Sequence, residues 1–266
     1  MNSATAPQMV QLDREGDVFV LTLCHGDNRW NTTLVEQINR ALDEVEHSEG
    51  PAALVTASAD PKFFSNGLDL DWLASRGEHP GGDRRVFAEV AMALFARVMT
   101  LPMPTVCAVN GTVAGGGLHF VVDSDVVVAA ENATFIDTHT NVGMVGAIEN
   151  IGLAKRLPLG TALRMTLQGK SFRLPAARAY ALGLVDELTP AGGALDGAMT
   201  IAQEISKNSP NANSLSMRAV WSATEMPYTQ AVEYGYALLR MHWLHPDFKE
   251  GPRAFAEKRE PQWATE

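Results

Sequence analysis

The sequence predicts an α/β fold that ends in a helical region, and three patterns lead to this prediction. Apolar runs of strand length alternate with helical patterns over the first half of the 266-residue chain. Some of these runs are apolar at every position, which is typical of parallel strands covered on both faces. After about Ala147 the pattern is helical. A chain of this length can form one domain with an appendage or two domains.

The first strands are expected near the N-terminus. The strand-like runs lie at residues 9–13, 18–23 and 52–57. Turn-forming residues at 14–17 separate the first two runs, so we expect an N-terminal hairpin there. The third run is short and apolar on both faces, which predicts a strand inside a parallel sheet.

A helix is expected between the hairpin and this buried strand. Apolar residues recur at helical spacing from Leu34 to Val45. Asn31-Thr32-Thr33 offers capping side chains before it. Glu36 follows Thr33 by three residues, as in a capping box. Gly50-Pro51 then predicts the end of the helix.

The middle of the chain predicts further strands separated by glycine turns. Residues 62–70 form a glycine-containing turn at the end of a strand, and residues 75–83 predict a mobile surface loop rich in Gly, Pro and charge. A helix is expected over residues 85–100. Further strands are expected at residues 105–109, 125–130 and 133–136, so the order of elements favours right-handed crossovers.

The last third of the chain predicts a layer of helices. The expected helices cover residues 147–157, 161–167, 175–182, 195–208, 210–223, 229–244 and 248–258.

Composition excludes several classes of function. A net charge of −10 argues against nucleic acid as the main partner, because such proteins carry a basic surface. The two cysteines, Cys24 and Cys107, lie in apolar runs and predict neither a disulfide framework nor a metal site. The N-terminus lacks the pattern of a signal peptide, and no apolar run has membrane-spanning length. We therefore expect a cytoplasmic protein with no membrane partner.

The most informative stretch is a glycine triad between a buried strand and a buried helix. The strand is Thr105–Val109, the triad is Gly115–Gly117, and the helix is expected to start at Leu118. This order directs free backbone N–H groups at an anion, either a phosphate or an oxyanion that develops during a reaction. Tight packing of helix on strand is the alternative without a ligand. A dinucleotide site is disfavoured, because its acidic residue and βαβ spacing are not evident.

Together with the turn at residues 62–70, this stretch resembles the enoyl-CoA hydratase/isomerase (crotonase) family. The resemblance covers nearly the whole chain, and its matches keep their order. They are Phe64–Leu70, Ala108–Gly111, Gly115–Gly117, Asp123–Asp125, Gln168–Lys170, Ala181–Asp186, Phe248–Gly251 and Lys258–Gln262.

The resemblance implies a spiral of ββα turns with a helical C-terminal region, assembled as a homotrimer or a dimer of trimers. Residues 1–200 would form the acyl-CoA-binding core and residues 201–266 the oligomerisation region. The substrate would be an acyl-CoA thioester, with coenzyme A as part of the substrate and no separate cofactor or metal. By position, the backbone N–H groups of Leu68 and Gly116 would form the oxyanion hole.

Further substrate-binding residues are expected around these turns. Asn66, Gly67 and Gly115 belong to the turns themselves. Lys62 and Arg29 could meet the phosphates of coenzyme A, although a solvated surface role is an equal alternative.

The chain departs from the family pattern at the two positions where hydratases commonly carry glutamates, because His119 and His139 stand there. We interpret both as acid/base residues, since one neutral and one charged imidazole can divide the roles of base and acid near neutral pH. A structural role in the pocket wall is the alternative. Asp137 and Glu149 are nearby carboxylates that could substitute, but a helix-terminal or surface role is favoured for them.

The reaction therefore stays open between several chemistries. Hydration needs an acid and a base, whereas one base suffices to isomerise a double bond. Thioester hydrolysis on the same scaffold is a rival, as is a catalytically silent acyl-CoA-binding protein. A structural α/β oligomer without a ligand is the most remote alternative.

Overall fold

A computed structural model describes residues 6–48, 50, 52–75, 91, 93–94 and 97–264. The mobile loop predicted at residues 75–83 lies almost entirely outside the described residues, as does most of the helix predicted at residues 85–100. The described residues between 91 and 98 are helical. Among the helices described, none is both long and apolar enough to cross a membrane.

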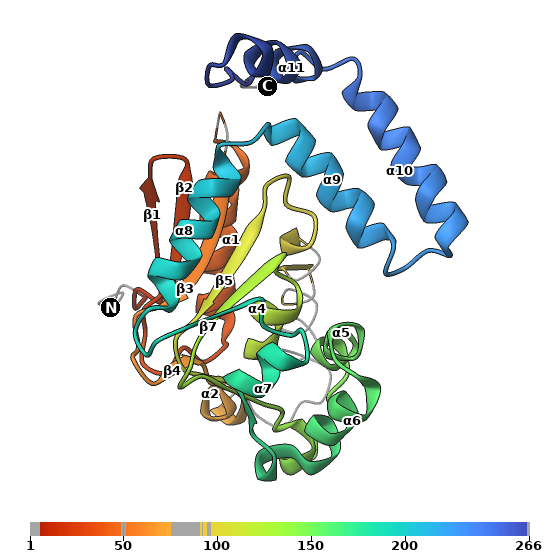
Figure 1. The fold of residues 1–266 in the computed structure, drawn as a ribbon. Coiled ribbons are helices and arrows are strands. Elements are labelled where there is room, and N and C mark those ends of the chain that lie inside the picture. Colours follow the sequence, from red (N-terminus) through yellow and green to blue (C-terminus); the bar gives the residue numbers. More distant parts are fainter. Residues whose placement is uncertain are drawn as a thin grey trace.

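The larger of two sheets has six strands in the order β1-β2-β3-β5-β7-β10 (Figure 1). The strands are β1 Val10–Glu15, β2 Val18–Leu23, β3 Ala53–Ser58, β5 Thr105–Val109, β7 Val126–Ala130 and β10 Glu187–Thr189. Strands β1 and β2 form the predicted antiparallel hairpin, and all other pairs are parallel. The α/β prediction and the buried strands are thus confirmed.

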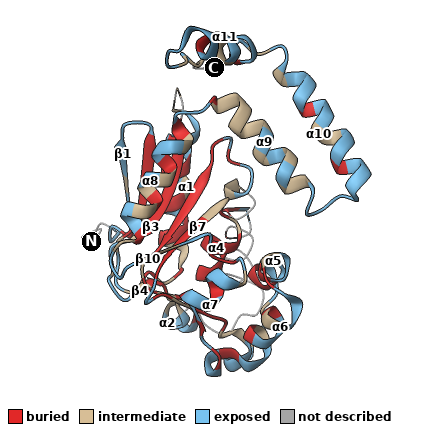
Figure 2. Ribbon diagram, viewed as in Figure 1, coloured by how far each residue is buried: buried red, intermediate tan, exposed pale blue. Residues whose placement is uncertain are grey.

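The central strands β2, β3, β5 and β7 are buried on both faces, and alternate residues of each point to different cores (Figure 2). On one face, Val55, Val106 and Val128 pack with Ala194, Ala198 and Ala202 of helix α8 (Ala194–Ser206). The three alanines lie four residues apart and let the helix approach closely. The opposite face belongs to the larger core, which explains why the strands are apolar at consecutive positions.

The smaller sheet has the order β4-β6-β8-β9. Its strands are β4 Phe63–Ser65, β6 Thr112–Ala114, β8 Thr134–Ile136 and β9 Leu174–Pro175. Strands β4, β6 and β8 are parallel, and each follows a strand of the larger sheet along the chain. The repeated passage from larger to smaller sheet gives the chain its spiral course, and it aligns the carboxyl ends of three short strands.

Helices cover the sheets, close to the predicted ranges. The helices near the sheets are α1 Thr32–Glu46, α2 Leu70–Ser75, α4 His119–Val122, α5 Ile148–Arg156, α6 Leu159–Gln168 and α7 Ala176–Ala181. The described residues also form the 3₁₀ turns η1 Gly115–Leu118 after β6, η2 His139–Val142 after β8 and η3 Gly169–Ser171 after α6. Asn31 caps α1 by accepting a hydrogen bond from the Leu34 amide at 3.0 Å, so Thr33 is not the capping residue.

The last three helices extend away from the sheets (Figure 1). They are α9 Pro210–Ser222, α10 Tyr228–His242 and α11 Asp247–Glu257. Much of their surface is exposed (Figure 2). The expected boundary at residue 200 falls within α8, which packs on the larger sheet, and the projecting part begins at α9. The oligomerisation role of this region stays a prediction.

Candidate active site

The site lies where β4, β6 and β8 end. Since these strands are parallel neighbours, their carboxyl ends meet at one edge of the smaller sheet. Asn66-Gly67-Leu68 follows β4, the glycine triad follows β6, and Asp137 and His139 follow β8. Segments far apart in the sequence are thereby brought together.

Gly67 holds the first two turns against each other. Its φ of +74° lies in the left-handed region that glycine adopts most readily. A Cβ atom on Gly67 would lie 2.6 Å from the Ala114 carbonyl oxygen and 3.3 Å from the Gly116 nitrogen. Only a residue without a side chain permits this approach, so the sequence places the Leu68 and Gly116 amides near one another.

The Leu68 and Gly116 amides stand apart from the hydrogen bonds that their neighbours make. The Trp30 amide donates to the Gly67 carbonyl at 2.7 Å, and the Asp69 amide donates to the Trp30 carbonyl at 2.9 Å. This pairing turns the Leu68 N–H away from Trp30. Gly116 lies in the first turn of η1, where amides have no partner within the helix. Neither amide is paired with an acceptor in the described parts of the chain.

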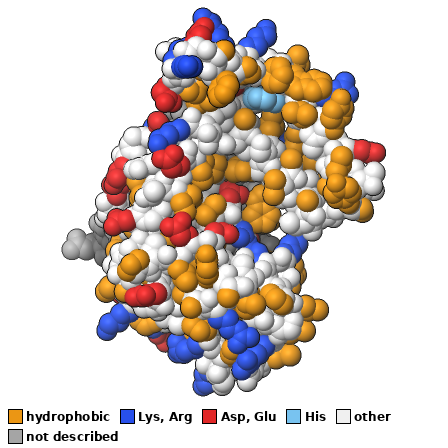
Figure 3. All heavy atoms as spheres, viewed as in Figure 1, with side chains coloured by type: hydrophobic (Ala, Val, Ile, Leu, Met, Phe, Trp, Pro, Cys, Tyr) orange, Lys and Arg blue, Asp and Glu red, His pale blue; other side chains and the backbone are white. Residues whose placement is uncertain are grey.

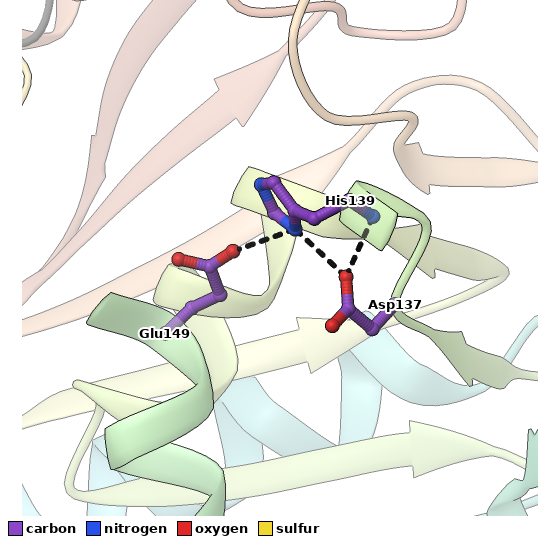
Figure 4. A group of neighbouring side chains, drawn as sticks. All are labelled: Asp137, His139 and Glu149. Carbon is purple, nitrogen blue, oxygen red and sulfur yellow. Dashed lines mark hydrogen bonds and ion pairs between the residues drawn. The ribbon is translucent and has the colours of Figure 1, made fainter. Parts of the chain in front are cut away.

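His139 is oriented by a buried carboxylate (Figure 4). Its Nδ1 lies 2.7 Å from Oδ1 of Asp137, and its backbone N–H donates to the same oxygen at 3.0 Å. Asp137 is fully buried, and its other oxygen accepts from Asn150 at 2.6 Å. No described residue pairs with Nε2 of His139. The ring lies beside the glycine turn, since its Cε1 would be 3.6 Å from a Cβ atom on Gly115.

His119 has different surroundings, although it belongs to the same cluster. It is buried in α4, and its Nδ1 lies 2.8 Å from Oδ2 of Asp123 one turn later. Its Nε2 lies 3.5 Å from Oε2 of Glu149. Both ring nitrogens of His119 therefore face carboxylates.

Glu149 lies between the two histidines. Its Oε1 is 3.0 Å from Nδ1 of His139, and the residue is 5% exposed. Glu149 and Asp137 were predicted to lie at a helix terminus or on the surface. Both side chains are buried, so the prediction of a surface position was wrong. Glu149 does occupy the first turn of α5, where a glutamate is favoured by the helix dipole. That ordinary role hid its position in the site, and the residues before it carry no signal of its burial, because Ala147 and Ile148 are exposed.

The surroundings shift the pKa values of all four groups at the centre of the site. The hydrogen bond with Asp137 raises the pKa of His139 against the opposing effect of burial, and Glu149 adds to the rise. Burial alone would lower the pKa of His119, but Asp123 and Glu149 outweigh it and raise that pKa. Burial opposes ionisation of Glu149 and Asp137, yet the histidines and further hydrogen bonds lower both pKa values.

The same cluster fits a metal ion poorly. Ligand-type atoms of Asp137, His139 and Glu149 all lie within 4.8 Å of one another. However, Nδ1 of His139 is only 2.7 and 3.0 Å from the two carboxylate oxygens. Two ligands on a tetrahedral ion with bonds of about 2.1 Å would be about 3.4 Å apart. The spacing suits a shared proton better than a shared cation.

The other predicted binding residues lie around the first turn. Arg29 pairs with Asp27 at 3.0 Å and with Asp71 at 3.1 Å, and Asn66 donates to the same Asp27 carboxylate at 2.9 Å. Lys62 is exposed and comes directly before β4. Contact of Arg29 or Lys62 with phosphate stays a prediction.

The sequence matches the enoyl-CoA hydratase/isomerase family over residues 13–266. The chain belongs to this family. It is 33% identical to a putative enoyl-CoA hydratase of Thermus thermophilus, over 96% of this chain and all of that protein. It is 30% identical to the carnitinyl-CoA dehydratase of Salmonella agona, over 96% of this chain and 98% of that protein.

The family assignment agrees with the fold. The structure of an enoyl-CoA hydratase from Bacillus anthracis superimposes with a TM-score of 0.90 at 25% identity, covering 97% of this chain and all of that one. The crotonase-like fold expected from the resemblance is thus confirmed.

Proposed function

We propose that this protein is an acyl-CoA enzyme of the hydratase/isomerase type, in which one histidine moves the proton. The Leu68 and Gly116 amides would hold the thioester oxygen, and His139 would exchange a proton with the substrate through Nε2. The observation that carries this proposal is that two amides and one imidazole nitrogen without a partner among the described residues lie around the Gly67 and Gly115 turns. The family membership supports the substrate class.

The two amides suit the charge that this chemistry creates. Removal of a proton next to a thioester, or addition of water across its conjugated double bond, places negative charge on the carbonyl oxygen. Fixed donors aimed at such an oxygen lower a barrier by about 3–4 kcal/mol each. They need no reorganisation during the reaction, because Gly67 and the strand ends hold them in place.

The two histidines would divide the work unequally. His139 has one nitrogen on Asp137 and one that no described residue contacts, which is the arrangement of an oriented general base. His119 has carboxylates at both nitrogens, so we assign it to the charge balance of the site. A single base favours isomerisation, and hydration requires His139 to activate water and then return the proton to the α-carbon.

Turnover of conjugated and non-conjugated enoyl-CoA thioesters of several chain lengths tests the proposal. We expect a change in the absorbance of the conjugated thioester. His139→Gln should lower kcat by about 10²–10⁴-fold, while calorimetry shows unchanged binding of a saturated acyl-CoA. Release of free thiol would instead support thioester hydrolysis. Tight acyl-CoA binding without turnover at any chain length would instead support a catalytically silent acyl-CoA-binding protein.

A further inference from the structure

Glu149 is placed to act on both histidines at once, and the reaction described above gives it no role. Its Oε2 lies 3.5 Å from Nε2 of His119, and its Oε1 lies 3.0 Å from Nδ1 of His139. Oε1 is buried, and its close approach to Nδ1 is an ion pair without hydrogen-bond geometry, so no described residue donates a hydrogen bond to it. Figure 4 shows the carboxylate of Glu149 directed at the His139 ring from α5.

The five ionisable groups form an ordered chain that crosses three elements. Asp123 and His119 belong to α4 and its C-terminal end, Glu149 belongs to α5, and His139 and Asp137 follow β8. Each contact joins a carboxylate to an imidazole: Asp123 to His119, His119 to Glu149, Glu149 to His139, and His139 to Asp137. Among the described residues, Glu149 is the one that contacts both histidine–aspartate pairs.

Charge balance gives this link a consequence. Three carboxylates face two imidazoles, so the cluster carries a charge of −3 when both rings are neutral and −1 when both are protonated. Buried charge of one sign is costly, which favours the protonated rings. His119 has both nitrogens on carboxylates, whereas no described residue contacts Nε2 of His139.

We infer that Glu149 is a positioning residue that couples the protonation of His119 to that of His139 and so sets the pH at which His139 can accept a proton. The inference rests on the proposed function for its catalytic meaning, but the coupling itself does not. When Nε2 of His139 gains a proton, a C–H or O–H bond of the substrate or water breaks and an N–H bond forms. The Nδ1 proton then lies between Asp137 and Glu149, which stabilise the new positive charge. The proton leaves Nε2 in the reverse step.

Titration of the histidine ring resonances by NMR tests the coupling without any substrate. In Glu149→Gln, loss of the anion should move the titrations of both His119 and His139 to lower pH, by about one pH unit or more for a charge this close. Glu149→Asp keeps the charge and should move them less. The matched control is Glu225→Gln, because Glu225 is an exposed carboxylate that pairs at 3.3 Å with Lys155 of α5, the helix that carries Glu149. It should leave both titrations unchanged.

A second variant tests the same link from its other end. His119→Gln removes an imidazolium that opposes protonation of His139, so the His139 titration should rise. Titrations of His139 that stay within a few tenths of a pH unit in both Glu149→Gln and His119→Gln would overturn the inference. A wild-type titration that changes on addition of EDTA would also overturn it, since the cluster would then hold a metal ion.

The pH dependence of kcat separates coupling from simple structural support. If His139 must be neutral to act, the acidic limb of the profile should move to lower pH in Glu149→Gln, in step with the NMR titration. A uniform loss of kcat with an unmoved limb would contradict the coupling. If no enoyl-CoA is turned over but the resonances shift as expected, the proposed function fails and the coupling stands.

Discussion

At the scale of single residues, the atoms around each ring nitrogen distinguish His119 from His139. The resemblance led us to expect glutamates at both positions, and nothing in the local sequence distinguishes the roles of the two histidines. Asp123 and Glu149 occupy both sides of His119, whereas Asp137 occupies one side of His139. We therefore assign the proposed proton exchange to His139, because no described residue contacts its Nε2.

Gly67 is the residue whose replacement should damage the site most directly without altering an ionisable group. In Gly67→Ala the new methyl group would meet the Ala114 carbonyl oxygen at 2.6 Å and push the two turns apart. Displacement of one oxyanion donor costs about 10²–10³-fold in kcat. Steady-state kinetics on the enoyl-CoA that the wild type converts measure this loss.

Gly16→Ala is the matched control for Gly67→Ala. Gly16 also has a positive φ, of +61°, but a Cβ atom there would meet nothing within 4 Å. Both variants should lose about 1–2 kcal/mol of stability from the left-handed backbone alone. Only Gly67→Ala should lose activity. Equal kcat values in the two variants would contradict the role of the Leu68 and Gly116 amides.

At the scale of elements, the sequence predicted long segments well and very short ones poorly. The apolar runs that became β2, β3, β5 and β7 are strong signals, because both faces of these strands are buried. Strands β6, β9 and β10 were not predicted, since two or three residues carry no periodicity.

The same limit applies to the site. The two glycine turns and the two histidines could be identified along the chain. The position of Glu149 could not, because it depends on how α5 packs across the end of β8. A contact between elements of this kind has no signature in local sequence.

The N-terminus of α1 provides a test at this scale. Asn31→Ala should lower the free energy of unfolding by about 1 kcal/mol, because it removes the acceptor for the Leu34 amide. Thr33→Ala should change it much less, although Thr33 and Glu36 have the spacing of a capping box. Urea unfolding of the two variants measures the difference, and a larger loss for Thr33→Ala would contradict the observed cap.

At the scale of the whole molecule, the buried cluster links stability to pH. The pKa values of His119 and His139 are raised above the ordinary 6.5. The two protonated rings therefore stabilise the fold fully below pH 6.5, and this stabilisation is lost as the pH rises through their folded-state pKa values. The lowered pKa of Glu149 acts in the opposite direction, since its contribution is complete above the ordinary 4.5 and is lost in acid. The cluster should therefore stabilise the fold most between about pH 4.5 and 6.5.

Urea unfolding at several pH values and constant ionic strength checks this prediction. The free energy of unfolding of the wild type should fall from pH 6 towards pH 9, and His119→Gln should show a shallower fall. His25→Gln, which changes an exposed histidine, should follow the wild type. If the free energy of unfolding depended on pH in the same way in the wild type and in His119→Gln, the predicted link between this cluster and stability would be contradicted.

The projecting C-terminal helices make self-association the remaining expectation at this scale. Apolar side chains gather along them (Figure 3), and Leu244 and Phe255 are 90% and 87% exposed. Exposed apolar surface of this kind marks an interaction site more often than a solvated face.

Light scattering after gel filtration should give about three or six times the chain mass of 28.7 kDa, as expected for a homotrimer or a dimer of trimers. Leu239→Glu combined with Leu244→Glu should reduce this mass, because charges cannot be buried there without a partner. Gln230→Glu adds a charge at an exposed polar position of α10 and should not reduce it. A wild type that elutes as a monomer at micromolar concentration would overturn the expectation, and the helices would then have to cover another part of the same chain.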